Sequence, residues 1–309
     1  MSSVPDRKTV ARRRALVLQI KKFGQKEFGL PVTKNFTHSD FNVGVVYFVD
    51  WCSGVSFYEK RDGILGTHET KNKEEAISCC RKKLLNGFDA FIFCAGGVFK
   101  VNKNYSGALL TSYHLKVDLF NLASTIFHED FHAWVAKNKL TSIERHDIQE
   151  PMATLFGDLG SLLWIKENGC SRNFLKRCKK FMKREICDAS SLDRVSGELV
   201  KIYKNPNISK KNKWAVKTQF FKKNRSLISR YSGSFDDVAN NASLYVARDY
   251  SKYLPLFYSF CQCHTSIDNP DLRLILEKLD NMAKKSKSKK DFIRRMQNSV
   301  NSLSKRNKK

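Results

Sequence analysis

The sequence has no apolar run that approaches the roughly eighteen residues of a membrane-spanning helix. Its basic start, which includes Arg12, Arg13 and Arg14, leads into only a short, largely apolar stretch. We therefore predict neither a signal peptide nor a transmembrane segment. There is no internal repeat, and 41% hydrophobic residues can supply a sizeable core. A chain of 309 residues with this composition is expected to be globular.

The nine cysteines lack the regular spacing of a disulfide framework or of a structural zinc site. Their number is odd, no interval repeats, and several lie in apolar segments. The cluster Cys261-Gln-Cys263-His264 lacks the paired CxxC spacing of zinc ribbons and fingers. We predict free thiols in a reducing compartment. The predicted location is therefore intracellular, with cytoplasmic, nuclear and virion-associated versions left open.

Acidic residues are scarce relative to basic ones. The chain has 30 Asp plus Glu against 56 Lys plus Arg, which gives a net charge of +26. The excess is concentrated in residues 172–184, 201–230 and 284–309, and aromatic residues interleave with lysines in the middle segment. Such a mixture can contact phosphates and stack bases, so nucleic acid or another polyanion is a predicted partner of the basic C-terminal region. A solvated basic surface explains the pattern equally well.

Residues 128–132 read His-Glu-Asp-Phe-His, an HExxH motif. Asp118 can cap a helix whose apolar residues recur at three-to-four spacing to about Asn138, so the motif falls inside a helix. His128 and His132 then share one face and can bind one zinc ion, and Glu129 lies beside them. The chemistry indicated is zinc-assisted hydrolysis. The alternative is two partly buried histidines on an amphipathic helix, with Glu129 as a solvated acid.

A zinc site of this kind needs a third protein ligand. Glu150 precedes Pro151, which can occupy the first turn of a second helix, and a carboxylate there would project toward the first helix. His146 is the other candidate, in the loop expected over residues 137–149. We favour Glu150 as the third ligand. The alternative without a role in metal binding is that Glu150 caps the second helix.

The residues from His128 to about Glu167 resemble the zincin metallopeptidases. In the gluzincin branch, HExxH is followed by a glutamate on a second helix, and residues 150–157 are similar to the Glu-x-x-Ala-x-x-Phe-small pattern of such helices. The resemblance implies one Zn²⁺ per chain held by His128, His132 and Glu150, with Glu129 as the general base and a protein or peptide as the substrate. A second resemblance is to SprT-like proteases, which act on proteins crosslinked to DNA and would use His146.

Two features depart from the gluzincin pattern. Pro151 disfavours a helical conformation at the preceding residue, so Glu150 is expected at the helix cap. Thr154 stands where the thermolysin branch has an acid, which leaves Asp158 or Asp147 to support an imidazole ring. The oxyanion-stabilising residue is not singled out, and the candidates are Tyr231, Tyr245, Tyr250 and His264.

The predicted fold class is α+β and zincin-like. A mixed sheet-plus-helix lobe over residues 1–139 carries the HExxH helix, a mainly helical lobe over 140–282 supplies the third ligand, and a basic tail covers 283–309. Residues 88–101 have strand-like content broken by Gly96 and Gly97, which fits a hairpin or a bulge. The second half can be the edge strand that holds substrate, and the alternative, which we favour slightly, is a hairpin buried in the core.

The leading functional prediction is a zinc-dependent metallopeptidase that hydrolyses peptide bonds. Its alternatives are a SprT-like DNA-associated protease and, from another class, a basic nucleic-acid-binding or virion structural protein with a non-catalytic HExxH. Metal content separates the enzyme predictions from the last one.

Overall fold

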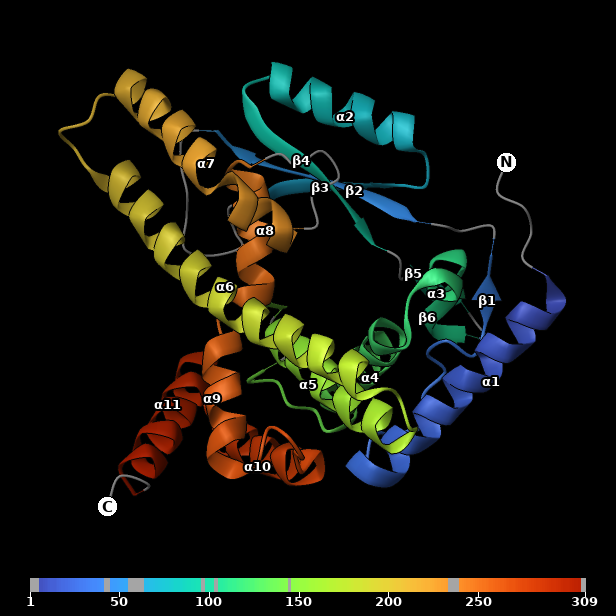
Figure 1. Cartoon of the computed structure of the whole chain (residues 1–309). Coiled ribbons are helices and arrows are strands. Elements are labelled where there is room, and N and C mark those ends of the chain that lie inside the picture. The colour runs from blue at the N-terminus through green and yellow to red at the C-terminus, as the bar shows by residue number, and fades with distance from the viewer. Residues whose placement is uncertain are drawn as a thin grey trace. The chain divides into compact units, whose positions relative to one another are not determined.

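The computed structural model describes residues 6–41, 45–54, 64–95, 98–102, 105–143, 146–232 and 239–306 (Figure 1). It is a mixed α+β protein with a mainly helical C-terminal part. The helices are α1 (Arg7–Phe23), the π-helical turn η1 (Gly24–Phe28), α2 (Lys73–Leu85), α3 (Ser112–Lys116), α4 (Leu119–Lys137), α5 (His146–Glu167), α6 (Arg172–Lys204), α7 (Lys210–Ser232), α8 (Asn241–Ser251), α9 (Leu254–His264), α10 (Leu272–Lys284) and α11 (Lys289–Arg306). The strands are β1 (Ser39–Asp40), β2 (Val46–Ser53), β3 (Ile64–Thr70), β4 (Phe88–Ala95), β5 (Val98–Asn102) and β6 (Tyr105–Thr111).

The chain forms two compact units, each assembled from separate segments. Unit 1 contains residues 1–42, 97–186 and 253–309, and unit 2 contains residues 43–96 and 187–252. The HExxH motif and Glu150 both belong to unit 1. Within the described ranges, no helix is both long and apolar enough to cross a membrane. The predicted boundaries at residues 139 and 282 stay predictions.

Each unit has its own three-stranded sheet. In unit 1 the order is β1-β6-β5, with β1 parallel and β5 antiparallel to β6. In unit 2 the order is β3-β2-β4, and both pairs are antiparallel. The predicted hairpin over residues 88–101 is therefore wrong, because β4 pairs with β2 and β5 pairs with β6. The strand-forming residues were visible in the sequence, but the choice of ladder partner depends on tertiary contacts. Within the described residues β5 lies at an edge of its sheet.

In unit 2, alternate residues of β4 face two different helical layers. Ala90 and Ile92 pack in a cluster with Ala76 and Cys80 of α2, whereas Phe91 packs with residues of α7 and α8. A buried ion pair holds α7 to the same strand, because Lys217 Nζ lies 2.6 Å from Asp89 Oδ1. Period-two alternation thus gives this sheet two apolar faces, each covered by helix. As predicted, all nine cysteines are free thiols.

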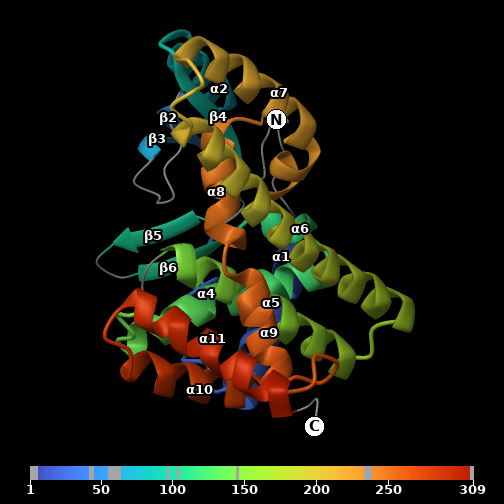
Figure 2. The same cartoon turned by 90° about the vertical axis from the view of Figure 1, so that its left-hand side faces the viewer.

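In unit 1, helices α4 and α5 lie side by side (Figures 1 and 2). A Cβ atom placed on Gly157 of α5 would lie 2.5 Å from the backbone oxygen of Ser124 in α4. A Cβ atom on Gly160 would lie 2.8 Å from the ring of Phe127, which is fully buried. The two glycines therefore remove the side-chain bulk that would otherwise separate the helix backbones.

A buried polar network fixes the opposite side of α4. Lys21 of α1 forms an ion pair with Asp130, with Nζ 3.0 Å from Oδ2, and their side chains are only 4% and 2% exposed. The hydroxyl of Thr33 and the amide of Asn35 also donate to Asp130 Oδ1. Because every polar atom in such a place needs a partner, this network orients α4 about its axis.

We expect Gly157→Ala to lower the free energy of unfolding by about 1–3 kcal/mol, because the added methyl group overpacks a backbone contact. Gly197→Ala in α6 is the matched control. A Cβ there would meet no atom within 4 Å, so removal of the helical glycine should leave stability unchanged or raise it. Denaturant unfolding measures both variants, and equal midpoints for the two would contradict the close crossing.

We also expect Asp130→Ala to cost about 3–5 kcal/mol of stability, because it leaves the buried Lys21 ammonium without its counter-ion. The Lys21→Met, Asp130→Ala double variant should be more stable than Asp130→Ala alone. Lys26→Met serves as the control, since Lys26 forms an exposed pair with Glu27 and its loss should change little. A double variant less stable than Asp130→Ala would show that the stranded charge is not the cause.

Candidate metal centre

Helix α4 forms where the sequence predicts it, with Asp118 as its N-cap. The Asp118 side chain accepts a hydrogen bond from the backbone N–H of Asn121 at 2.8 Å. Apolar residues at helical spacing, including Ile126, Phe127 and Phe131, are fully buried and set the rotation of the helix. The two motif histidines fall at the border of this buried face, with side chains 18% and 23% exposed. Each ring is therefore partly buried and still in contact with solvent.

Helix α5 begins at His146, so Glu150 lies inside the helix and Pro151 follows it within the helix. The expected position of Glu150 at a cap is wrong. The physical reason is packing, because Ile148 is fully buried and continues an apolar stripe with Met152 and Leu155. Burial of that stripe outweighs the hydrogen bond that the proline removes.

The spacing of residues on both helices explains why Glu150 meets the histidines. Ser124, His128 and His132 are four residues apart and share one face of α4. On α5, Glu150 lies seven residues, or about two turns, before Gly157, and shares its face. Since Gly157 touches Ser124, that shared face of α5 meets the histidine face of α4. The small residues Ala153 and Gly157 thus let a carboxylate approach two imidazoles.

Three potential ligand atoms converge at this contact. The Nε2 atoms of His128 and His132 lie 3.0 Å apart. Glu150 Oε2 lies 3.2 Å from His128 Nε2, and Glu150 Oε1 lies 3.5 Å from His132 Nε2. In a tetrahedral zinc site with ligand bonds of about 2.0–2.2 Å, two ligand atoms are about 3.3–3.6 Å apart. With one ligand atom from each residue, the three atoms lie within 4.8 Å of one another, so the cluster could bind a metal ion after a small adjustment of its side chains.

The electrostatics of the cluster favour an ionised glutamate. Burial opposes the charge of Glu150, yet hydrogen bonds to His128 and His132 hold the pKa of its carboxyl well below the usual range. Burial also disfavours a charged His128, but the hydrogen bond and charge of Glu150 raise the pKa of that ring. A divalent cation would take the place of the ring protons, because a metal ligand must be a neutral imidazole or an ionised carboxylate.

Two further carboxylates surround the cluster. Glu129 is half-buried, and its charge contributes to the raised pKa of His128. Asp158 of α5 is buried and accepts a hydrogen bond from Ser124 at 2.7 Å. Burial raises the pKa of Asp158 to about 6, while the Ser124 hydrogen bond and the charge of His128 act in the other direction. Of the two expected supporting acids, Asp158 thus lies in electrostatic reach of the cluster, whereas Asp147 forms an ion pair with Lys289 of α11.

The other sequence-predicted site residues lie elsewhere or outside the description. The side chains of His146 and Tyr231 are outside the described residues. Tyr245 is buried in the core of unit 2, where Tyr250 also packs. His264 lies on α9 and hydrogen-bonds to Ser299 of α11 at 3.2 Å, on the wall of a separate cavity.

Sequence reasoning missed Asn35, which ties the motif to the sheet. Its amide Nδ2 donates to the backbone oxygen of Glu129 at 3.1 Å, and its Oδ1 accepts from the backbone N–H of Ala108 in β6 at 3.0 Å. The side chain is buried. The sequence contains only a weak sign of this network, because helical periodicity assigns Lys21 and Asp130 to buried faces of their helices. No pattern marked Asn35 itself.

Comparison with known proteins gives one family. The model of the family described as "Putative aminopeptidase" matches residues 108–294, more than half of the 309 residues. The matched segment contains the HExxH motif and Glu150 together with helices α3 to α10. No curated protein and no solved structure matches the chain significantly. The family match supports a peptidase that acts on proteins or peptides. On this match, the chain belongs to the "Putative aminopeptidase" family.

Proposed function

We propose that this protein is a zinc-dependent peptidase of the gluzincin type. His128, His132 and Glu150 would hold one Zn²⁺ per chain, and Glu129 would be the general base. The observation that carries the proposal is the convergence of His128, His132 and Glu150, which each offer one ligand atom, with the three atoms within 4.8 Å of one another. Two imidazoles and a carboxylate are the ligand set of a zinc site that keeps its fourth position for water.

The roles of the protein groups follow from their chemistry. Zinc, when bound, supplies a Lewis acid and lowers the pKa of a water molecule to about 7. The Glu129 carboxylate receives a proton from the attacking water and passes it to the departing amine nitrogen as the peptide C–N bond breaks. The charge of Asp158 acts on the His128 ring and contributes to its raised pKa. Asn35 fixes the backbone of Glu129, so the base keeps its place beside the histidines.

The family description favours cleavage at a free amino terminus over cleavage inside a chain. A panel of amino-acid anilides with free and with acetylated amino groups distinguishes the two modes, because an aminopeptidase must recognise the free ammonium group. The SprT-like alternative requires His146 as the third ligand in place of Glu150. Intracellular location and contact of the basic C-terminal region with nucleic acid stay predictions of the sequence.

We expect purified protein to contain about one zinc per chain, and both His132→Ala and Glu150→Ala to lose it, because two ligands cannot retain the ion that three hold. Metal analysis by atomic spectroscopy measures this. His68→Ala is the matched control, since His68 also contacts a glutamate, Glu75, at 3.0 Å but belongs to no potential metal cluster among the described residues. Zinc loss in His146→Ala with retention in Glu150→Ala would move the third ligand to His146 and overturn the gluzincin assignment.

We further expect Glu129→Gln to keep its zinc and to lose about 10²–10⁴-fold in kcat/KM, because an amide cannot accept the proton from water. Hydrolysis of the anilide panel measures the loss. Glu74→Gln in α2, an exposed glutamate, should retain full activity. If Glu129→Gln keeps full activity, Glu129 is not the base. If the zinc-loaded parent protein hydrolyses none of the substrates, the protein is not the peptidase that we propose.

A further inference from the structure

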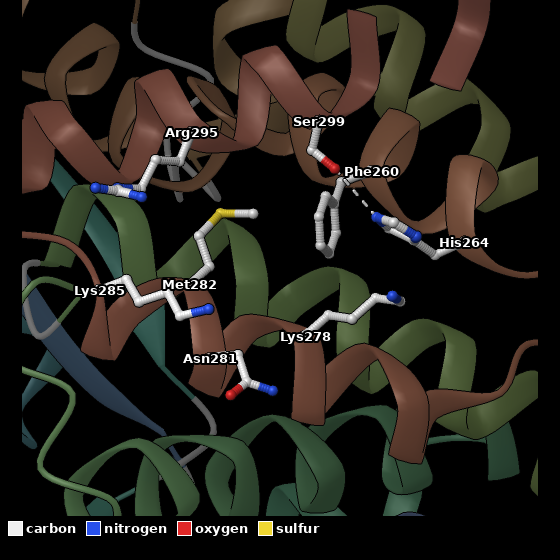
Figure 3. A pocket seen from close by; sticks show the side chains of 8 residues that line it. All are labelled: Phe260, His264, Lys278, Asn281, Met282, Lys285, Arg295 and Ser299. Atoms are coloured by element: carbon white, nitrogen blue, oxygen red, sulfur yellow. Dashed lines mark hydrogen bonds between the residues drawn. The ribbon is translucent and has the colours of Figure 1, made fainter. Parts of the chain in front are cut away.

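A cavity in unit 1 lies between α9, α10 and α11, and neither His128 nor His132 belongs to its lining (Figure 3). Its volume is about 450 Å³. This is within the range of about 300–1,000 Å³ that is usual for small-ligand sites. The lining residues are Phe260, His264, Lys278, Asn281, Met282, Lys285, Arg295 and Ser299.

The charges that line this cavity are all of one sign. Lys278 comes from α10, Lys285 is the C-cap residue of α10, Arg295 comes from α11, and no aspartate or glutamate belongs to the lining. Figure 3 shows the three cationic side chains among those that line the cavity. Because like charges gathered at a concave surface repel one another and reinforce the local potential, this arrangement is stabilised by an anion.

Two neighbouring cations of these helices are neutralised within the protein. Lys284 pairs with Asp280 at 2.7 Å, and Arg294 pairs with Asp291 at 2.7 Å. Arg295 shares Asp291 through Nε at 3.0 Å, which leaves the terminal nitrogens of its guanidinium for another acceptor. In the part of the chain that the structure describes, no carboxylate forms an ion pair with Lys278 or Lys285. The cavity is thus lined by two lysines that have no counter-ion among the described residues and by an arginine that Asp291 contacts only through Nε.

The same cavity also has an apolar wall and neutral polar groups. Phe260 stands at its back beside the thioether of Met282 (Figure 3). The His264 ring contacts Phe260 edge-on, with centroids 4.6 Å apart, and its Nε2 lies 3.2 Å from the Ser299 hydroxyl. Burial and the neighbouring Lys278 lower the pKa of His264. The ring is therefore neutral near pH 7 and acts as a hydrogen-bonding group beside an apolar surface.

We propose that this cavity is a binding site for an organic phosphate of nucleotide size. Its phosphate groups would contact Lys278, Lys285 and Arg295, and its apolar or aromatic body would lie against Phe260 and Met282. Three cations match the charge of a diphosphate better than the single charge of a carboxylate. The proposal is independent of the peptidase chemistry, because none of its residues belongs to the cluster of His128, His132 and Glu150.

Isothermal titration of the full-length protein with ADP, pyrophosphate and adenosine at low ionic strength tests the proposal. We expect ADP to bind most tightly, pyrophosphate more weakly, and adenosine without detectable heat. Lys278→Ala and Lys285→Ala should each weaken ADP binding about tenfold, because each removes a charge-assisted contact. Met282→Ala should weaken ADP and leave pyrophosphate unchanged, since only ADP carries a body that reaches the apolar wall.

Two controls separate a built site from general attraction to a protein of net charge +26. Lys284→Ala removes an adjacent charge of α10 that does not line the cavity, so ADP affinity should stay within about twofold. His132→Ala should also retain ADP affinity, since the phosphates are not expected to coordinate a metal at the histidines. Equal losses in Lys284→Ala and Lys278→Ala, loss in His132→Ala, or tighter binding of a glutamate-rich peptide than of ADP would each overturn the proposal.

Discussion

The close crossing of α4 and α5 is the constraint on which the candidate metal centre depends. Helix backbones approach this closely only where a residue without a side chain faces the neighbouring backbone, as Gly157 faces Ser124. The regular spacing of residues along both helices then places the potential ligands near one another. One turn beyond Ser124 lies His128, another turn on lies His132, and two turns back from Gly157 lies Glu150. A hydrogen bond from the Ser161 hydroxyl to the Phe120 carbonyl, at 2.8 Å, fixes the register at the other end.

The basic residues of this protein serve two physical purposes. Lys21 and Lys217 are buried and paired with Asp130 and Asp89, so each orients a helix against its neighbours. Burial lowers the pKa of Lys21, and the charge and hydrogen bond of Asp130 oppose that effect. Lys278 and Lys285 instead face a cavity without acids. Net charge alone does not distinguish these roles, because it counts paired and unpaired cations equally.

The family match covers the residues that could bind the metal, whereas the structure also shows the residues outside the match that hold helix α4 in place. Residues 108–294 include both helices that bear the potential ligands. The partners that hold the rear of α4, namely Lys21, Thr33 and Asn35, precede the matched segment. A motif model records which side chains occur at which spacing, whereas the orientation of Glu129 depends on a hydrogen bond from residue 35 to its backbone. The chemistry and the scaffold that positions it are thus encoded in separate stretches of the chain.

By itself, the sequence determined the features that local physics controls. Capping at Asp118 and the apolar period fixed helix α4 to within a residue, and helical spacing put His128 and His132 on one face. It also indicated strand-like content over residues 88–101, broken by two glycines, and marked Glu150 as a candidate ligand. Only the tertiary structure decided the strand partners, because ladder pairing joins residues far apart in the chain. It likewise decided that α5 begins at His146, because burial of Ile148 outweighs the local preference set by Pro151. The convergence of Glu150 with the histidines belongs to this second class, since it arises from a contact between two helices and not from the pattern of either one.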